Sequence, residues 1–197
     1  MMRLLAFFVV LALPLRAEEF PALHAVTGVA SDDVLNIRAE PDAGSEIIGG
    51  LAPDATGVEV VGTSGDWALV NTGDGSGYAA LRFLAREEGP AWNSLQVPLT
   101  CLGTEPFWSL RIDPVARMAS FSSPENLDGS VYAIDQQWPA EPWSRTAAVG
   151  LSVGTVVLHP LQCSDGMSDR SYGISVDVFF AAPETSRLSG CCRLGMQ

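Results

Sequence analysis

Lysine is absent from the 197 residues of this chain, so its 11 basic residues are all arginines. They stand singly among 23 acidic residues, and the formal net charge is −12. Binding to nucleic acid needs positive charge gathered on one face or in one segment. This balance therefore argues against a nucleic-acid partner and is typical of an acidic surface that keeps an exported protein soluble.

Histidine is also scarce, because only His24 and His159 occur. The four cysteines include no Cys-x-x-Cys pair, and none has a histidine nearby in sequence, so the spacing of a structural zinc site is missing. The acids show no EF-hand alternation either. We expect neither a metal nor another cofactor.

Long apolar runs are confined to the first residues. Arg3 precedes the apolar residues 4–13, and Leu15-Arg16-Ala17 resembles a cleavage site, which together predict a signal peptide over residues 1–17. The apolar run is shorter than the ~20 residues of a spanning helix. We expect a periplasmic or secreted protein that does not span the membrane once it is processed near Ala17.

Four cysteines in an exported chain predict two disulfides. A bond between the neighbours Cys191 and Cys192 would strain the peptide between them. In a strand these two side chains point to opposite faces, and Cys192 shares the inward, apolar phase of Leu188 and Leu194. One of the pair therefore bonds Cys163 and the other Cys101, and both pairings stay open.

The first half of the chain consists of short extended runs between turn residues. Strands are predicted at residues 34–38, 58–61, 67–70 and 78–81, separated by segments rich in glycine, proline, aspartate and serine. Nothing over residues 24–84 has a helical period of useful length. The pattern predicts a small all-β barrel.

Several motifs in this half resemble the bacterial SH3 (SH3b) domain, in the same order and at similar separations. They are LNIRAEP at 35–41, SEIIGGL at 45–51, DWALV at 66–70 and GYA at 77–79. The resemblance implies a non-catalytic SH3-like barrel over residues 24–86 that recognises cell-wall peptide or another envelope partner. Its candidate ligand residues are Asn36, Arg38, Trp67 and Tyr78, and core packing is the alternative role for the two aromatic rings.

Residues 87–96, which include Glu87-Glu88-Gly89-Pro90, are predicted to be a linker to a second domain over residues 97–197. Its alternating runs predict an antiparallel barrel or sandwich braced by the disulfides, with Trp108 on the inner face of a strand. Residues 136–143 hold two tryptophans and two prolines and are predicted to form a surface loop.

Three motifs of the second half, GTEPFWSL, CSDGMSDRSY and LSGCCR, resemble those of a family of uncharacterised exported bacterial proteins. Members of that family often have Tyr-Pro-Tyr where this chain has Tyr172-Gly173-Ile174. The resemblance implies a shared domain without implying a reaction.

The polar residues of these motifs form a second candidate site. Paired carboxylates could serve a cell-wall hydrolase, whereas turn aspartates that accept backbone N–H groups are an ordinary structural alternative. A Ser168-His159-Asp165 triad is possible on paper. The preferred function is an envelope-associated binding or accessory protein that is not an enzyme, with a wall hydrolase or an inhibitor of an envelope hydrolase as alternatives. No catalytic residue is assigned, and the candidate residues are Glu105, Trp108, Asp165, Asp169 and Tyr172.

Overall fold

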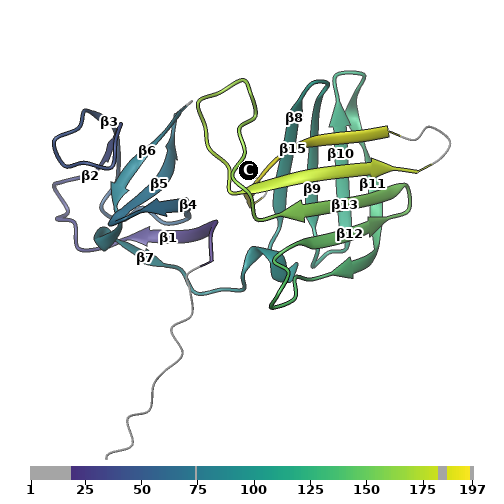
Figure 1. Cartoon of the computed structure of the whole chain (residues 1–197), viewed down its shortest axis with the longest axis horizontal. Helices are drawn as coiled ribbons and strands as arrows, with labels where there is room; N and C mark the ends of the chain where they lie inside the picture. The colour runs from purple at the N-terminus through teal and green to yellow at the C-terminus, as the bar shows by residue number, and fades with distance from the viewer. Residues whose placement is uncertain (1–18, 74, 182–185, 196–197) are drawn as a thin grey trace, which may run out of the picture.

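The structure, a computed structural model, describes residues 19–73, 75–181 and 186–195, so the expected signal peptide lies outside the described residues. Strands make up nearly all of the regular structure, and two single-turn 3-10 helices are the exceptions among these residues. The all-β prediction is confirmed. Figure 1 shows a smaller sheet and a larger barrel side by side, with a long loop between them.

The first body is a seven-stranded antiparallel sheet in the order β3-β2-β6-β5-β4-β1-β7. Its core gathers small and β-branched side chains from alternate positions, among them Ile37, Val60, Val70 and Ala79. The 3-10 helix η1 (Leu81–Phe83) leads into the last strand. The strands are β1 (Ala22–Val26), β2 (Leu35–Arg38), β3 (Ile47–Leu51), β4 (Val58–Ser64), β5 (Trp67–Thr72), β6 (Gly75–Ala80) and β7 (Leu84–Arg86).

The second body is a closed antiparallel barrel in the order β10-β11-β12-β13-β14-β15-β8-β9. The pairing of β15 with β8 completes the ring, which settles the choice between barrel and sandwich. Closure leaves none of these strands with an unpaired edge. They are β8 (Leu99–Thr104), β9 (Phe107–Asp113), β10 (Met118–Ser123), β11 (Asn126–Trp138), β12 (Ala147–Leu151), β13 (Gly154–His159), β14 (Ile174–Phe180) and β15 (Ser186–Leu194).

The barrel core follows the predicted alternation, since Trp108, Leu110 and Ile112 of β9 all point inward and are buried. The segment that we expected to be a linker contributes to this core. Its 3-10 helix η2 (Trp92–Ser94) buries Trp92 among the barrel residues, and Leu95 follows it. The segment is therefore packed against the barrel.

The prediction of a surface loop over residues 136–143 is wrong at its start. Strand β11 continues to Trp138, where it pairs with Ala148 of β12 after a register shift between Ile134 and Gln136. The irregular segment begins only at Pro139, because proline cannot donate to the ladder.

Both disulfides join segments that are distant in sequence. Cys101 bonds Cys192, and Cys163 bonds Cys191, which resolves the two pairings left open above. Cys192 points into the barrel core, as its phase in the strand predicted. Cys191 has the opposite phase, yet it is fully buried because the loop that carries Cys163 covers it.

Candidate functional site

Three neighbouring strands place the SH3-type candidate residues on one face of the first sheet. Cross-strand pairing sets Arg38 opposite Tyr78, Tyr78 opposite Leu69, and Trp67 opposite Ala80. Residues directly opposite each other share a face. This face is the outer one, because the alternating positions such as Ile37 and Ala68 are buried in the core.

A groove of about 440 Å³ lies on the first sheet, and we call it the sheet groove. Asn36, Arg38 and Trp67 all line it, together with residues of the segment before β2 and of η1. Tyr78 is on the same face but is not one of the lining residues. The structure thus brings together three of the four SH3-type candidates, and Trp67 is only half-buried there.

The charged residues that line the sheet groove are two arginines, Arg38 and Arg82, and one aspartate, Asp33. Arg38 is held by a hydrogen bond from its Nη1 to the carbonyl oxygen of Ser45, 2.6 Å away. Arg82 is exposed and lies 4.6 Å from the centre of the Phe83 ring, a cation–π distance. Among the described residues that line the groove, Asp33 is the only acidic one. Two guanidinium groups therefore stand against one carboxylate in the lining.

In the barrel half, residues 163–172 form a loop closed at its base. Cys163 and Tyr172 exchange two backbone hydrogen bonds, of 2.9 and 3.0 Å, and the Cys163–Cys191 disulfide fixes the same end to β15. We call this segment the bridging loop. In Figure 1 it is the yellow-green segment between the first sheet and the barrel.

Asp165 organises the inside of the bridging loop. Its Oδ1 accepts the backbone N–H groups of Met167 and Ser168, and its Oδ2 accepts the hydroxyls of Ser168 and Tyr172, all within 3.1 Å. Burial alone would raise the pKa of Asp165, but these hydrogen bonds outweigh it and lower that pKa. Burial first, and then the nearby Asp165 charge, raise the pKa of Tyr172. This is the turn-stabilising role of an aspartate.

The other carboxylates of the second candidate site do not gather around Asp165. Asp169 is exposed, and its backbone pairs with Gly75 of the first sheet. Glu105 lies in the β8–β9 turn and shares a hollow of about 360 Å³ with Asp165. A paired-carboxylate mechanism thus has only Glu105 and Asp165 to use. An Asp165 that is held ionised and fully hydrogen-bonded is a poor proton donor.

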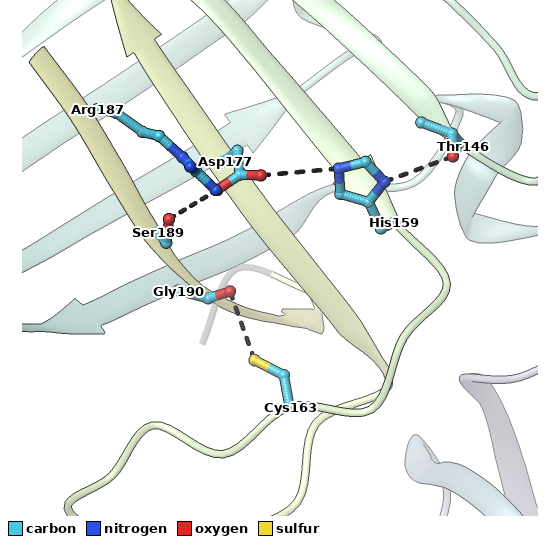
Figure 2. Close-up of polar contacts among 7 residues, drawn as sticks. All are labelled: Thr146, His159, Cys163, Asp177, Arg187, Ser189 and Gly190. Atoms are coloured by element: carbon cyan, nitrogen blue, oxygen red, sulfur yellow. Dashed lines mark hydrogen bonds and ion pairs between the residues drawn. The ribbon is translucent and has the colours of Figure 1, made fainter.

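The Ser168-His159-Asp165 triad is wrong. Ser168 does bond Asp165, but the imidazole of His159 faces another aspartate on the outer barrel wall (Figure 2). His159 Nε2 lies 3.8 Å from Asp177, and its Nδ1 lies 3.5 Å from the Thr146 hydroxyl. With no imidazole at Ser168, this serine lacks the base that a nucleophile requires.

Asp177 is the centre of the cluster that holds His159. It accepts hydrogen bonds from Arg187 and Ser189 of the neighbouring strand β15. Burial would raise the pKa of Asp177, but the bonds from Ser189 and Arg187 prevail and lower it. Figure 2 also draws Cys163 beside the carbonyl oxygen of Gly190, at 3.4 Å. That contact is a sulfur–oxygen approach, because a disulfide sulfur carries no hydrogen.

The three motifs of the second half meet at one rim of the barrel. The Trp108 indole packs over Gly103 of the first motif and Gly190 of the last, where an added Cβ atom would lie within 2.6 and 2.9 Å of the ring. Asp165 and Tyr172 of the middle motif line the same region. Residues of all three motifs thus lie close together in space, although the motifs are far apart in sequence.

A groove of about 720 Å³ lies between the bridging loop and the barrel wall at this rim, and we call it the wall groove. Outward-facing residues of β8, β9 and β10 form one side, as the pairs Leu102–Ser109, Thr104–Phe107 and Ser109–Ser122 require. Loop residues form the other side. Its lining includes Trp108, Asp165, Met167, Ser168, Arg170 and Tyr172, and thus three of the five second-site candidates.

Sequence reasoning missed the contact between the two bodies. The Asn71 side chain exchanges two hydrogen bonds with the Ser171 backbone, and the Ser76 hydroxyl bonds the Asp169 carbonyl oxygen. Arg170 donates through Nε and Nη2 to the carbonyl oxygen of Gly73. The bridging loop is therefore fixed at its base to the barrel and, through residues 169–171 of its second arm, to the β5–β6 hairpin. No local sequence pattern signals pairing between segments so far apart.

Within the ranges that the structure describes, no group of three or more histidine, cysteine, aspartate or glutamate residues is placed to hold a metal ion. The same residues include no helix with the length and apolar character needed to cross a bilayer. The two disulfides are consistent with a location outside the cytoplasm.

Comparison with curated proteins and with solved structures gave no match. The resemblance stated for the second half therefore has no support from these comparisons. A family model does match part of the first half. Residues 33–85 match the bacterial SH3 domain, which is a binding module often connected with the cell wall.

Proposed function

We propose that this chain is an exported, envelope-associated binding protein whose first domain holds a cell-wall peptide in the sheet groove. One observation carries the proposal. The segment that matches the bacterial SH3 domain presents Asn36, Arg38 and Trp67 together in one groove. An aromatic face beside a polar amide and a fixed guanidinium is the mixture that ligand grooves use for affinity and orientation.

The charge of the sheet groove supports a ligand that carries a carboxylate. Arg38 and Arg82 face one acid, Asp33, on a chain with a formal net charge of −12. Arginine suits carboxylates because its guanidinium offers a planar fork of N–H donors. Cell-wall peptides carry free carboxylates, so they match this local field.

The test is sedimentation of the full mature chain with purified sacculi. The full chain is needed because a fragment starting at residue 24 would cut strand β1 (Ala22–Val26). We expect the wild-type chain to sediment, Trp67→Ala and Arg82→Ala to remain largely in the supernatant, and a soluble wall peptide to compete. Equal sedimentation of Trp67→Ala and wild type, or none by wild type, would overturn the proposal.

A matched control is available on the barrel. Trp143 is 82% exposed and lies outside the sheet groove, so Trp143→Ala removes an exposed indole without touching the proposed site. It should sediment like the wild type. A thermal unfolding curve for each variant then separates loss of binding from loss of the fold.

A further inference from the structure

The wall groove combines an apolar surface with hydroxyl groups. Phe107 is 51% exposed at its edge, and Leu127 and Met167 are more exposed still. Exposed apolar side chains gathered around one groove are unusual on a soluble surface unless something binds there. At about 720 Å³, the groove also falls within the usual size of small-ligand sites, roughly 300–1,000 Å³.

The hydroxyl groups of the barrel side have no hydrogen-bond partner among the described residues. Thr104, Ser109, Ser122 and Ser123 line the groove, and their side chains form no hydrogen bond with any other described residue. A hydroxyl group both donates and accepts. Four such groups in the lining of one groove are therefore suited to a ligand whose own groups do both, as sugar hydroxyls do.

The charged groups of the wall groove are already occupied. Asp165 accepts four hydrogen bonds inside the bridging loop, and Arg170 donates to the carbonyl oxygen of Gly73. One acid and one base in the lining also balance each other. A neutral ligand fits this environment better than an ion does.

The topology disfavours an extended peptide as the occupant. Peptides commonly bind sheets by adding a strand to an open edge. Strands β8, β9 and β10 belong to the closed barrel and are paired on both sides, so the wall groove offers no such edge. Recognition there has to come from side chains.

We propose that the wall groove is a second binding site, for a neutral saccharide whose ring lies on Phe107 and whose hydroxyls bond the barrel-side serines and threonine. The apolar face of a sugar ring covers an aromatic side chain well, and the rim of the ring presents the hydroxyls. This site is separate from the sheet groove and does not depend on peptide binding there.

The test is isothermal titration calorimetry of the full chain with the neutral β-1,4-linked trimer of N-acetylglucosamine, and with neutral tetra-alanine for comparison. We expect the trimer to bind and Phe107→Ala to weaken it about tenfold, or about 1.4 kcal/mol. Ser109→Ala combined with Ser122→Ala should weaken binding as well. Phe179→Ala is the matched control, because Phe179 is a similarly exposed phenylalanine on β14, outside the groove.

Three results would overturn the proposal: no heat of binding with the trimer, equal affinity in Phe107→Ala and Phe179→Ala, or binding of tetra-alanine instead of the saccharide. Trp67→Ala separates this site from the sheet groove. If that variant loses binding of the soluble wall peptide but still binds the trimer, both sites stand. If wild type binds the trimer but not the soluble wall peptide, only the peptide proposal fails.

Discussion

Asn71 and Ser171 lie 100 residues apart in sequence and are joined by two hydrogen bonds. Asn71 Nδ2 donates to the Ser171 carbonyl oxygen at 2.9 Å, and the Ser171 N–H donates to Asn71 Oδ1 at 3.0 Å. The Asn71 side-chain amide thereby pairs with the N–H and carbonyl groups of Ser171, as the backbone of a neighbouring strand would. Because this loop is also one side of the wall groove, Asn71 of the first sheet helps to set the shape of a groove on the barrel.

Replacing Asn71 should loosen the contact between the two bodies. In Asn71→Ala both bonds to Ser171 are lost, and the partly buried backbone groups of Ser171 stay unpaired, at a cost of roughly 1–3 kcal/mol. We expect faster hydrogen exchange across residues 163–172 and lower stability to urea. Asn126→Ala is the control, since the exposed Asn126 side chain bonds the Ser130 hydroxyl within its own hairpin and does not touch the bridging loop. Equal exchange of the loop in both variants would contradict the prediction.

A buried carboxylate at the same contact predicts a pH dependence. Burial raises the pKa of Glu59 to about 7, although the Leu194 N–H and the positive charge of Arg193 act in the opposite direction. The folded chain thus binds this proton more tightly than the unfolded chain. The stability that the protonated Glu59 carboxyl group contributes is fully present below its ordinary pKa of 4.5. This stability is lost as the pH rises through about 7.

Glu59→Gln should remove this pH dependence. At pH 8 we expect it to be more stable than wild type by roughly 3 kcal/mol, with little difference at pH 4.5. Urea unfolding at both values measures the effect. Arg193 faces Glu59 from β15, and Arg170 lines the same hollow, but neither changes its charge in this interval. A variant whose stability falls with pH as steeply as that of wild type would disprove the assignment to Glu59.

The sequence predicted the features that depend on neighbouring residues. Alternation placed Cys192 inward and Trp108 in the core, and the turn-rich segments marked an all-β chain. The bridging loop was visible only as a polar turn beside a cysteine. Its bonds to Asn71 and Gly73 depend on how two separate sheets meet, and no local period records that. Likewise, the Glu-Glu-Gly-Pro start suggested a linker, whereas Trp92 finds its partners in strands that come later in the chain.

The two disulfides should have different consequences when removed. Cys163–Cys191 holds the bridging loop against the outer wall, whereas Cys101–Cys192 joins two strands of the barrel. Paired alanine substitutions at 163 and 191 should cost about 3–4 kcal/mol by chain entropy and free the loop to exchange hydrogen. Removing the 101–192 bond should cost more, about 4–5 kcal/mol, because it closes a longer segment. Hydrogen exchange measured by mass spectrometry distinguishes the two, and unchanged protection of residues 163–172 in the first variant would contradict this role.

The packing of Trp108 over two glycines gives the sharpest test of the barrel rim. A Cβ atom at residue 103 would lie 2.6 Å from Trp108 Cε2, so Gly103→Ala forces the indole to move and should destabilise the chain by about 1–3 kcal/mol. Gly62→Ala on β4 is the control, because its nearest neighbour is the flexible Gln162 side chain at 3.4 Å. If the clash is with the indole, Trp108→Phe makes room for the added methyl group. The double variant should then lose less unfolding free energy than the sum of the two single losses, because the effects of substitutions at residues in contact are not additive. If the two losses of unfolding free energy simply add in urea unfolding, then Gly103 is needed because of the neighbouring backbone, and not because of the Trp108 indole.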